Sequence, residues 1–416
     1  MNTIAQTLAL PPDLLPPAYE DGTIASIPAT IAALLDVPFV GLPPLPKPLW
    51  QPLGSDIRRA VVITLDALGQ NLVEKEADHL EPYLSETAVR AQLTSIFPST
   101  TVAALSSMWT GSAPSQHGLA ALFLLFPEYG TIGQMLNFSP IFGTYPDALV
   151  TAGLKPEEYL PVPGMAQQLA AAGVPTYAFK GANIIESALS KMHGRGVAEN
   201  FGAYSLTDML VEVGRFLEEK AGQPLFINAY WPSIDTISHM RGWDGPQTAA
   251  EFHIIWQQIH ETLRQKLSPA ARRQTALFIT ADHGQLVTPK SRHVYLADHP
   301  QLAEMLLMRP AGEPRIAYLY ARQGCVPDIV AYVNKNLSEV ATAVPTPQAV
   351  AAGLFGPPPY APQLYNRLGD VVLIMRHNYL FIHPQDKELV ERLYGWHGGM
   401  TPAEMRVPWL GYRLDG

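Results

Sequence analysis

Four continuous apolar runs rich in β-branched residues recur along the chain, with amphipathic stretches between them. The runs lie at 60–65, 174–179, 224–230 and 275–280. Runs of this length are typical of strands buried on both faces of a parallel sheet. In the last amphipathic stretch, five apolar residues fall on one helical stripe: Phe252, Ile255, Ile259, Leu263 and Leu267. This alternation predicts an α/β fold whose doubly wound, mostly parallel sheet carries helices on both faces.

The N-terminal region differs in composition, because it is rich in proline. Residues 11–54 hold eleven of the 39 prolines, which remove backbone donors and fix φ. Only one short helix, at about 28–35, is compatible with this pattern. We therefore expect residues 1–54 to form an ordered, proline-rich arm that lies on the main body.

The pattern of apolar and polar residues changes a second time between about 289 and 381. Candidate strands there occur at 315–321, 340–345 and 369–376. Helical patterns near 328–337 and 347–352 separate them. The pattern predicts that 289–381 forms a smaller α+β insertion in a core built from 55–288 and 382–416.

The composition excludes several classes of protein. Of 416 residues, 47% are hydrophobic and 16% are charged, so the chain forms a large core and is not disordered. The 28 basic and 37 acidic residues give a net charge of −9, and no dense basic run is present to neutralise duplex nucleic acid or an anionic membrane. The longest apolar run, 119–126, has eight residues, whereas a membrane span needs roughly 18. We therefore expect neither duplex nucleic acid nor a membrane as a partner.

Cysteine usage is typical of a protein from a reducing compartment. Cys325 is the single cysteine, which excludes an intramolecular disulfide and a multi-cysteine metal site. Residues 1–10 lack the basic and apolar blocks of a signal peptide. We expect a cytoplasmic protein, and the sequence leaves its oligomeric state open.

Ionisable side chains directly follow the predicted strands, at the carboxyl ends where open parallel sheets bind ligands. Five residues occupy such positions: Asp66, Asp235, His239, Asp282 and His283. His397 can reach the same edge from a glycine-rich loop in the tail. Because clustered carboxylates repel one another, a metal ion is their simplest neutraliser.

Carboxylates and imidazoles without thiolates are a ligand set suited to Zn²⁺ or Mn²⁺. Asp235 and His239 are four residues apart, so on a helix they share one face and can hold one ion. Each motif alone has an ordinary structural interpretation, such as a helix N-cap for Asp66 or a turn for Asp282-His283-Gly284. Together, at neighbouring strand ends, they predict a dimetal site.

Thr101 is the candidate nucleophile. It opens a helical stretch at 102–109 that ends at Gly111, and the N-terminus of a helix is a natural seat for a phosphoryl oxygen. A threonine hydroxyl is protonated at neutral pH and needs activation. The sequence shows no recognisable Ser-His-Asp triad and no G-x-S-x-G nucleophile motif, so metal is the remaining means of activating the Thr101 hydroxyl. The alternative is that Ser99, Thr100 and Thr101 simply cap the helix.

These motifs follow one another in a recognisable order over about 56–290 and 390–416. They are Asp66, Phe97-Pro-Ser-Thr-Thr101, Trp109-Thr-Gly111 with Pro114, His117-Gly118, Asp235-x-x-x-His239, Asp282-His283-Gly284 and His397-Gly398-Gly399. As a set, they resemble the type I phosphodiesterase/nucleotide pyrophosphatase branch of the alkaline phosphatase superfamily. The resemblance implies an alkaline phosphatase-like core that holds two divalent metal ions, zinc in the first place and manganese as an alternative.

The resemblance also assigns roles to residues. The ion that activates the nucleophile would be held by Asp66, Thr101, Asp282 and His283. The second ion would be held by Asp235, His239 and His397. The family nucleophile falls on Thr101, and we expect His117 to brace its loop. Weaker candidates for contact with substrate are Lys180, His293 and His299.

The implied activity is metal-dependent hydrolysis of phosphodiester or pyrophosphate bonds in nucleotide-like or other small phosphoesters, through a phosphothreonine. One departure argues against nucleotides. Nucleotide-cleaving members carry an asparagine shortly after the His-Gly motif, where residues 119–126 are all apolar here. A phosphomonoesterase, phosphonate hydrolase or phosphomutase of the same superfamily remains an alternative, as does a catalytically silent binding protein.

Overall fold

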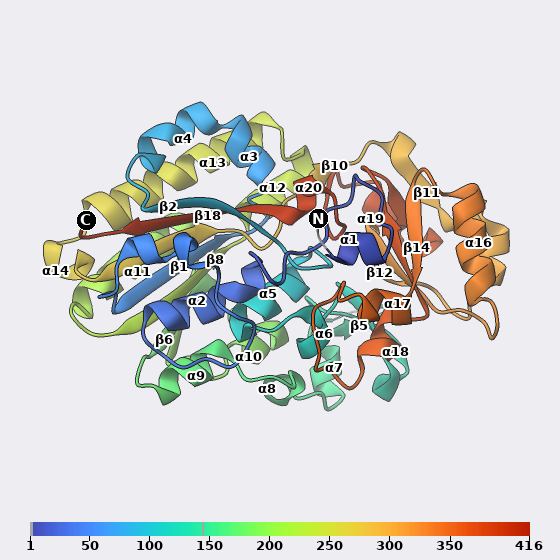
Figure 1. The fold of residues 1–416 in the computed structure, drawn as a ribbon, viewed down its shortest axis with the longest axis horizontal. Helices are drawn as coiled ribbons and strands as arrows, with labels where there is room; N and C mark the ends of the chain where they lie inside the picture. The colour runs from blue at the N-terminus through green and yellow to red at the C-terminus, as the bar shows by residue number, and fades with distance from the viewer. Residues whose placement is uncertain (1–2, 144) are drawn as a thin grey trace.

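The computed structural model describes residues 3–143 and 145–416, and its centre is a seven-stranded sheet in the order β2-β18-β9-β1-β8-β6-β7 (Figure 1). Its strands are β1 (Arg59–Leu65), β2 (Val89–Thr94), β6 (Thr176–Gly181), β7 (Glu199–Ala203), β8 (Leu225–Trp231), β9 (Thr275–Thr280) and β18 (Arg406–Arg413). Strand β18 runs antiparallel to both its neighbours, and the other pairs are parallel. The predicted mostly parallel sheet is therefore confirmed.

Helices cover both faces of this sheet, as the alternating pattern predicts (Figure 1). One face carries α3 (Gln70–Lys75), α4 (Ala77–Leu84), α11 (Leu206–Glu219) and α13 (Pro246–Ile259), which a π-helix at His260–Gln265 extends. The other carries α2 (Ile27–Leu34), α5 (Thr101–Thr110), α9 (Met165–Ala171) and α10 (Ala188–His193). The stripe of α13 is buried as expected, because Phe252, Ile255 and Ile259 face the core.

The proline-rich arm is part of the core. The short helix expected at about 28–35 is confirmed as α2, and Ile24, Ile31 and Leu53 pack into the apolar cluster of the main sheet. A short helix α1 (Thr3–Thr7) and three single 3₁₀ turns at Ile24–Ser26, Lys47–Leu49 and Gln51–Leu53 complete the arm. Pro48 and Pro52 are the second residues of the last two of these turns, where no backbone donor is needed.

A second, antiparallel sheet lies beside the first, in the order β14-β15-β13-β12-β3-β4-β5. Its strands are β3 (Phe123–Phe126), β4 (Thr131–Gln134), β5 (Ser139–Pro140), β12 (Ala311–Glu313), β13 (Ile316–Leu319), β14 (Ala341–Pro345) and β15 (Val371–Met375). The sheet is wider than the expected insertion at 289–381, because β3 to β5 come from the segment after the His117-Gly118 turn. The apolar run at 119–126 thus ends as a strand that contacts β12 at Gly312.

The remaining helices lie between strands within each sheet or between the two sheets. The helices are α6 (Pro114–His117), α7 (Ala148–Thr151), α8 (Pro156–Tyr159), α12 (Ser233–Arg241), α14 (Pro269–Arg272), α15 (Pro300–Glu304), α16 (Val326–Asn336), α17 (Thr346–Ala351), α18 (Leu364–Leu368), α19 (Lys387–Val390) and α20 (Pro402–Met405). Two small ladders join β10 (Leu286–Val287) to β17 (Gly395–Trp396) and β11 (His293–Tyr295) to β16 (Leu380–Ile382). No helix in the described part of the chain is long and apolar enough to cross a membrane.

Candidate active site

The carboxyl ends of three central strands place the acidic residues together. Strand β1 lies between β8 and β9, with Leu65 opposite Trp231 and Thr64 opposite Thr280. Asp66 therefore follows β1 at the level where β8 leads into α12 and β9 leads into Asp282. Because the three strands are parallel and in register, their following residues meet at one edge of the sheet.

Thr101 and His397 reach this edge from outside the central strands. Thr101 is the first residue of α5, and His397 directly follows β17. The two segments are joined through Ser99, whose carbonyl oxygen lies 3.1 Å from His397 Nδ1 and whose hydroxyl donates to the Gly399 carbonyl at 2.7 Å. The loop before the nucleophile and the tail loop therefore form one unit.

His283 is at the centre of a first group of candidate metal ligands. Its Nε2 atom lies 3.1 Å from Thr101 Oγ1. The same atom lies 3.4 Å from Asp66 Oδ1 and 3.5 Å from Asp282 Oδ2. Ligand atoms of Asp66, Asp282 and His283 all lie within 4.8 Å of one another, which is compact enough for a single ion.

Asp235 is at the centre of a second group. Its Oδ1 atom lies 3.2 Å from His239 Nε2, one turn along α12, and 3.6 Å from His397 Nε2. Asp235, His283 and His397 form a further triplet within 4.8 Å. The structure thus brings all seven predicted ligands together, and it places His283 between the two groups instead of in one alone.

The charge balance of the first group fits a bound cation. Asp66 Oδ1 and Asp282 Oδ2 are buried and have no hydrogen-bond partner within the described chain. Burial, together with the neighbouring carboxylates, raises the pKa of Asp66 well above its usual range. Burial also raises the pKa of Asp282. Buried carboxylate oxygens without donors are costly, and a divalent ion between these two oxygens would remove that cost.

The second group has a different balance, because imidazoles surround its carboxylate. Burial by itself would raise the pKa of Asp235, but the neighbouring His239 and His397 hold this pKa below its ordinary value. Burial works against protonation of His239 too, but Asp235 raises its pKa. His239 Nδ1 faces the Gly395 carbonyl at 2.7 Å, so Nε2 is left toward the site.

Two residues of the site carry no recognisable motif. Tyr230, near the end of β8, donates its hydroxyl to Asp66 Oδ2. Gln285 donates from Nε2 to Asp235 Oδ1 at 2.9 Å. A tyrosine inside an apolar strand carries no sequence signal of its own, whereas Gln285 could have been found from its position directly after Asp282-His283-Gly284.

Of the three weaker candidates for contact with substrate, the structure places only Lys180 in the cavity beside Thr101. His293 and His299 do not lie there, because the chain turns away after β10 into the β11–β16 ladder; His299 Nδ1 instead lies 3.0 Å from Tyr332 on α16. His117 is buried and bonds Ser107 of α5 at 3.0 Å, so it braces the helix that begins at Thr101.

The second sheet anchors the loop that carries His397. Arg315, in the turn between β12 and β13, is fully buried and donates to both carboxylate oxygens of Glu404, at 2.8 and 2.9 Å. Glu404 in turn accepts from the Gly399 amide at 2.9 Å and from the Thr401 hydroxyl at 2.7 Å. The loop from His397 to Glu404 is therefore tied to the antiparallel sheet.

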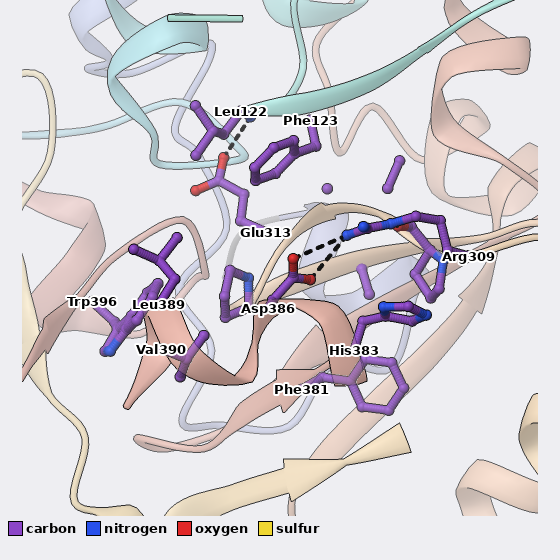
Figure 2. Close-up of a pocket in the computed structure, with 15 residues that line it drawn as sticks. Leu122, Phe123, Arg309, Glu313, Phe381, His383, Asp386, Leu389, Val390 and Trp396 are labelled. Atoms are coloured by element: carbon purple, nitrogen blue, oxygen red, sulfur yellow. Dashed lines mark hydrogen bonds and ion pairs between the residues drawn. The ribbon is translucent and has the colours of Figure 1, made fainter. Parts of the chain in front are cut away.

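Glu313 of β12 lies against the same loop and lines a neighbouring pocket of about 70 Å³ (Figure 2). Its Oε1 accepts from the Leu122 amide at 2.9 Å, and burial raises its pKa to about 7. Gly398 has φ +111°, and a Cβ there would lie 2.7 Å from Glu313 Oε2. The loop and β12 thus approach more closely than a side chain would allow. Figure 2 also shows the Arg309–Asp386 pair across this pocket.

The fold and this site define a hydrolase of the alkaline phosphatase superfamily. A family model described as type I phosphodiesterase/nucleotide pyrophosphatase matches residues 60–400, and the chain belongs to this family. This confirms the resemblance carried by the motifs. The family is metal-dependent, and the two groups of residues described above are candidates for binding metal.

Solved structures show the same fold at low sequence identity. Murine ectonucleotide pyrophosphatase/phosphodiesterase 5, in an inactive form with AMP, has a TM-score of 0.62 and 16% identity over 86% of this chain and 90% of that chain. Phosphonoacetate hydrolase from Sinorhizobium meliloti 1021, in complex with phosphonoacetate, has a TM-score of 0.64 and 18% identity over the same shares of the two chains. No curated protein matches the chain.

The buried Arg315–Glu404 pair gives a first prediction. Replacing Arg315 with Met leaves the Glu404 carboxylate buried and unpaired, which we expect to lower the free energy of unfolding by about 3–5 kcal/mol. Denaturant unfolding measures the loss. Arg309→Met is the matched control, since its partner Asp386 is partly exposed and the loss should be small. Equal losses in the two variants would contradict the anchoring role of Arg315.

The unpartnered carboxylates give a second prediction, on stability with and without metal. Because the folded pKa of Asp282 is raised, the stability that this group contributes is present below its ordinary pKa of 3.8 and is lost as the pH rises through the folded value. At pH 7 the metal-free Asp282→Asn protein should therefore melt at a higher temperature than the metal-free wild type. With Zn²⁺ the order should reverse.

Thermal denaturation at pH 7, with chelator and with Zn²⁺, measures both orders. Asp21→Asn, at an exposed position of the arm, is the control and should follow the wild type in both conditions. A metal-free Asp282→Asn protein that is less stable than the wild type would show that the carboxylate is satisfied without an ion.

Proposed function

We propose that this chain is a two-metal phosphohydrolase that cleaves small phosphoester or phosphonate substrates through a covalent intermediate on Thr101. The observation that carries the proposal is the position of Thr101 Oγ1, at the start of α5 and 3.1 Å from His283 Nε2. Asp66 and Asp235 line the same cavity, one from each ligand group. A hydroxyl in this position, at the N-terminus of a helix and beside the candidate metal ligands, is suited to attack phosphorus.

The donor set of each group suits a divalent ion such as Zn²⁺, with Mn²⁺ as the alternative. Asp66, Asp282 and His283, together with Thr101, would hold one ion, and Asp235, His239 and His397 the other. Bound there, the two ions would supply Lewis acidity to the entering and leaving oxygens. The buried oxygens without partners on Asp66 and Asp282 support this assignment.

The chain itself positions the reacting groups. Thr101 Oγ1 forms a bond to phosphorus as the bond to the leaving group breaks, and water then hydrolyses the phosphothreonine and restores the hydroxyl. The free amides in the first turn of α5 stabilise charge on the phosphoryl oxygens. The same residues therefore serve both displacements.

Two classes of substrate fit the family, and the site favours the smaller one. The murine relative was solved with AMP and the bacterial one with phosphonoacetate. Residues 119–126 offer no amide side chain to the phosphoryl group, which argues against nucleotides. A small phosphomonoester or phosphonate is therefore the preferred substrate, with phosphodiester or pyrophosphate cleavage as the alternative. The complete ligand set argues against a silent binding protein.

Replacement of Thr101 tests the nucleophile. Thr101→Ala should lower turnover of aryl phosphate mono- and diesters and of an aryl phosphonate by about a thousandfold or more, as expected for loss of a covalent nucleophile. Mass spectrometry of rapidly quenched wild type should find one added phosphoryl group on the peptide that contains Thr101.

Two controls make this test specific. Thr110→Ala, at the other end of α5, should leave turnover unchanged, and Thr101→Ser should retain a part of it. Metal content, measured by elemental analysis, should stay close to two ions per chain in Thr110→Ala. Unaltered turnover in Thr101→Ala would remove Thr101 from the role of nucleophile.

A further inference from the structure

A small cavity lies between α13 and the main sheet, on the face that α4 also covers (Figure 1). Its volume is about 10 Å³, close to the roughly 10–15 Å³ that one water-sized particle needs. Tyr83 of α4, Ile279 of β9 and Tyr412 of β18 line it, together with four residues of α13 and its π-helical extension. None of these residues lines the cavity beside Thr101, so the two sites are separate.

Three polar side chains of this cavity come from one face of the helix. Trp256, His260 and Arg264 follow one another at intervals of four residues, so they project from the same side. The helix widens into a π-helix from His260 to Gln265, and interruptions of this kind recur at functional sites. The helix therefore presents an indole, an imidazole and a guanidinium group to one small space.

Each of these three side chains has a buried nitrogen atom that lacks a hydrogen-bond partner in the described part of the chain. The atoms are Trp256 Nε1, His260 Nδ1 and Arg264 Nη1. Trp256 is only 1% exposed, so solvent does not replace the missing partner of its indole N–H. Since nearly all buried polar groups in proteins are paired, three unpaired nitrogens on side chains that line one cavity indicate a ligand there.

All three nitrogens are hydrogen-bond donors. An indole N–H and a guanidinium group can only donate. Gln265 donates from Nε2 to His260 Nε2 at 2.9 Å, so His260 Nε2 accepts and the imidazole proton lies on Nδ1. The side chains that line the cavity include no carboxylate and no amide. A water molecule has only two lone pairs and needs acceptors for its own two protons, whereas an anion accepts from all three donors.

We propose that this cavity binds a monatomic anion, chloride under ordinary solution conditions, through Trp256, His260 and Arg264. Arg264 supplies the positive charge, and its guanidinium group lies 4.5 Å from the centre of the Tyr412 ring. Its other terminal nitrogen, Nη2, pairs with Glu86, which is 59% exposed, so solvent screens the charge of that carboxylate. The ion ties the end of α13 to the main sheet and stabilises the fold. This inference goes beyond the proposed function and does not depend on it.

Bromide is a probe of this site because it is a monatomic anion with an anomalous X-ray signal. Crystals of the full chain grown in sodium bromide, with data collected at the bromine absorption edge, should show an anomalous peak in contact with the three nitrogens. Bromide peaks elsewhere alone, or no peak at all, would overturn the proposal, because the cavity then holds water or nothing.

Thermal denaturation of the zinc-loaded protein tests the same site in solution. When sodium chloride replaces sodium gluconate at constant ionic strength, Tm should rise to a plateau by about 2 °C or more, since the ion binds the folded state alone. A rise that does not saturate, or no rise, would overturn the proposal.

Variants assign this effect to the cavity. Trp256→Phe and Arg264→Met should each lose most of the rise in Tm with chloride, whatever their stability in gluconate. Trp409→Phe is the matched control, because Trp409 is equally buried but donates from Nε1 to the Leu49 carbonyl at 2.8 Å, outside the cavity. This control should melt at a lower temperature than the wild type and keep the full rise. A full rise in both cavity variants would place the chloride elsewhere and overturn the proposal.

Discussion

Burial of three carboxylates at one end of a parallel sheet is the constraint on which this structure depends. Asp66, Asp235 and Asp282 meet there because β1, β8 and β9 are adjacent and in register. Such a concentration of negative charge is unfavourable unless cations compensate it. Imidazoles compensate Asp235, whereas Asp66 and Asp282 keep oxygens that have no donor within the described chain. That difference is the physical reason to expect metal ions at this edge.

Distant parts of the chain are organised around the same edge. The second sheet contributes no metal ligand, yet its Arg315 holds Glu404, and Glu404 holds the loop after His397. The hydroxyl and the carbonyl of Ser99 tie that loop to the segment before Thr101. His397 lies on an irregular loop near the C-terminus, and buried hydrogen bonds therefore hold that loop on two sides. Preorganisation of this kind lets a loop residue serve a site that tolerates little displacement.

The cavity next to Thr101 carries opposite charges at its two ends. Carboxylates line its metal end, and one buried lysine lies in its apolar wall. The family's shared chemistry belongs to the first end, because the ligand motifs are there. The other end is lined by Trp109, Phe179 and Lys180, which belong to none of the ligand motifs. Relatives with less than a fifth of their residues identical share the fold, so the fold alone does not name the substrate.

Periodicity was enough to predict the parallel sheet and its helices, and strand-end position together with the family resemblance predicted the candidate ligands from Asp66 to His397, because these features are local patterns in the sequence. Sequence reasoning could not find Tyr230 or the Arg315–Glu404 anchor, since an isolated polar residue in an apolar strand or turn has no local signature. It also placed His293 and His299 near the site and left β3 to β5 out of the second sheet. Those outcomes were decided by which edges and apolar faces pair across the tertiary structure, and such pairing depends on residues far apart in the chain.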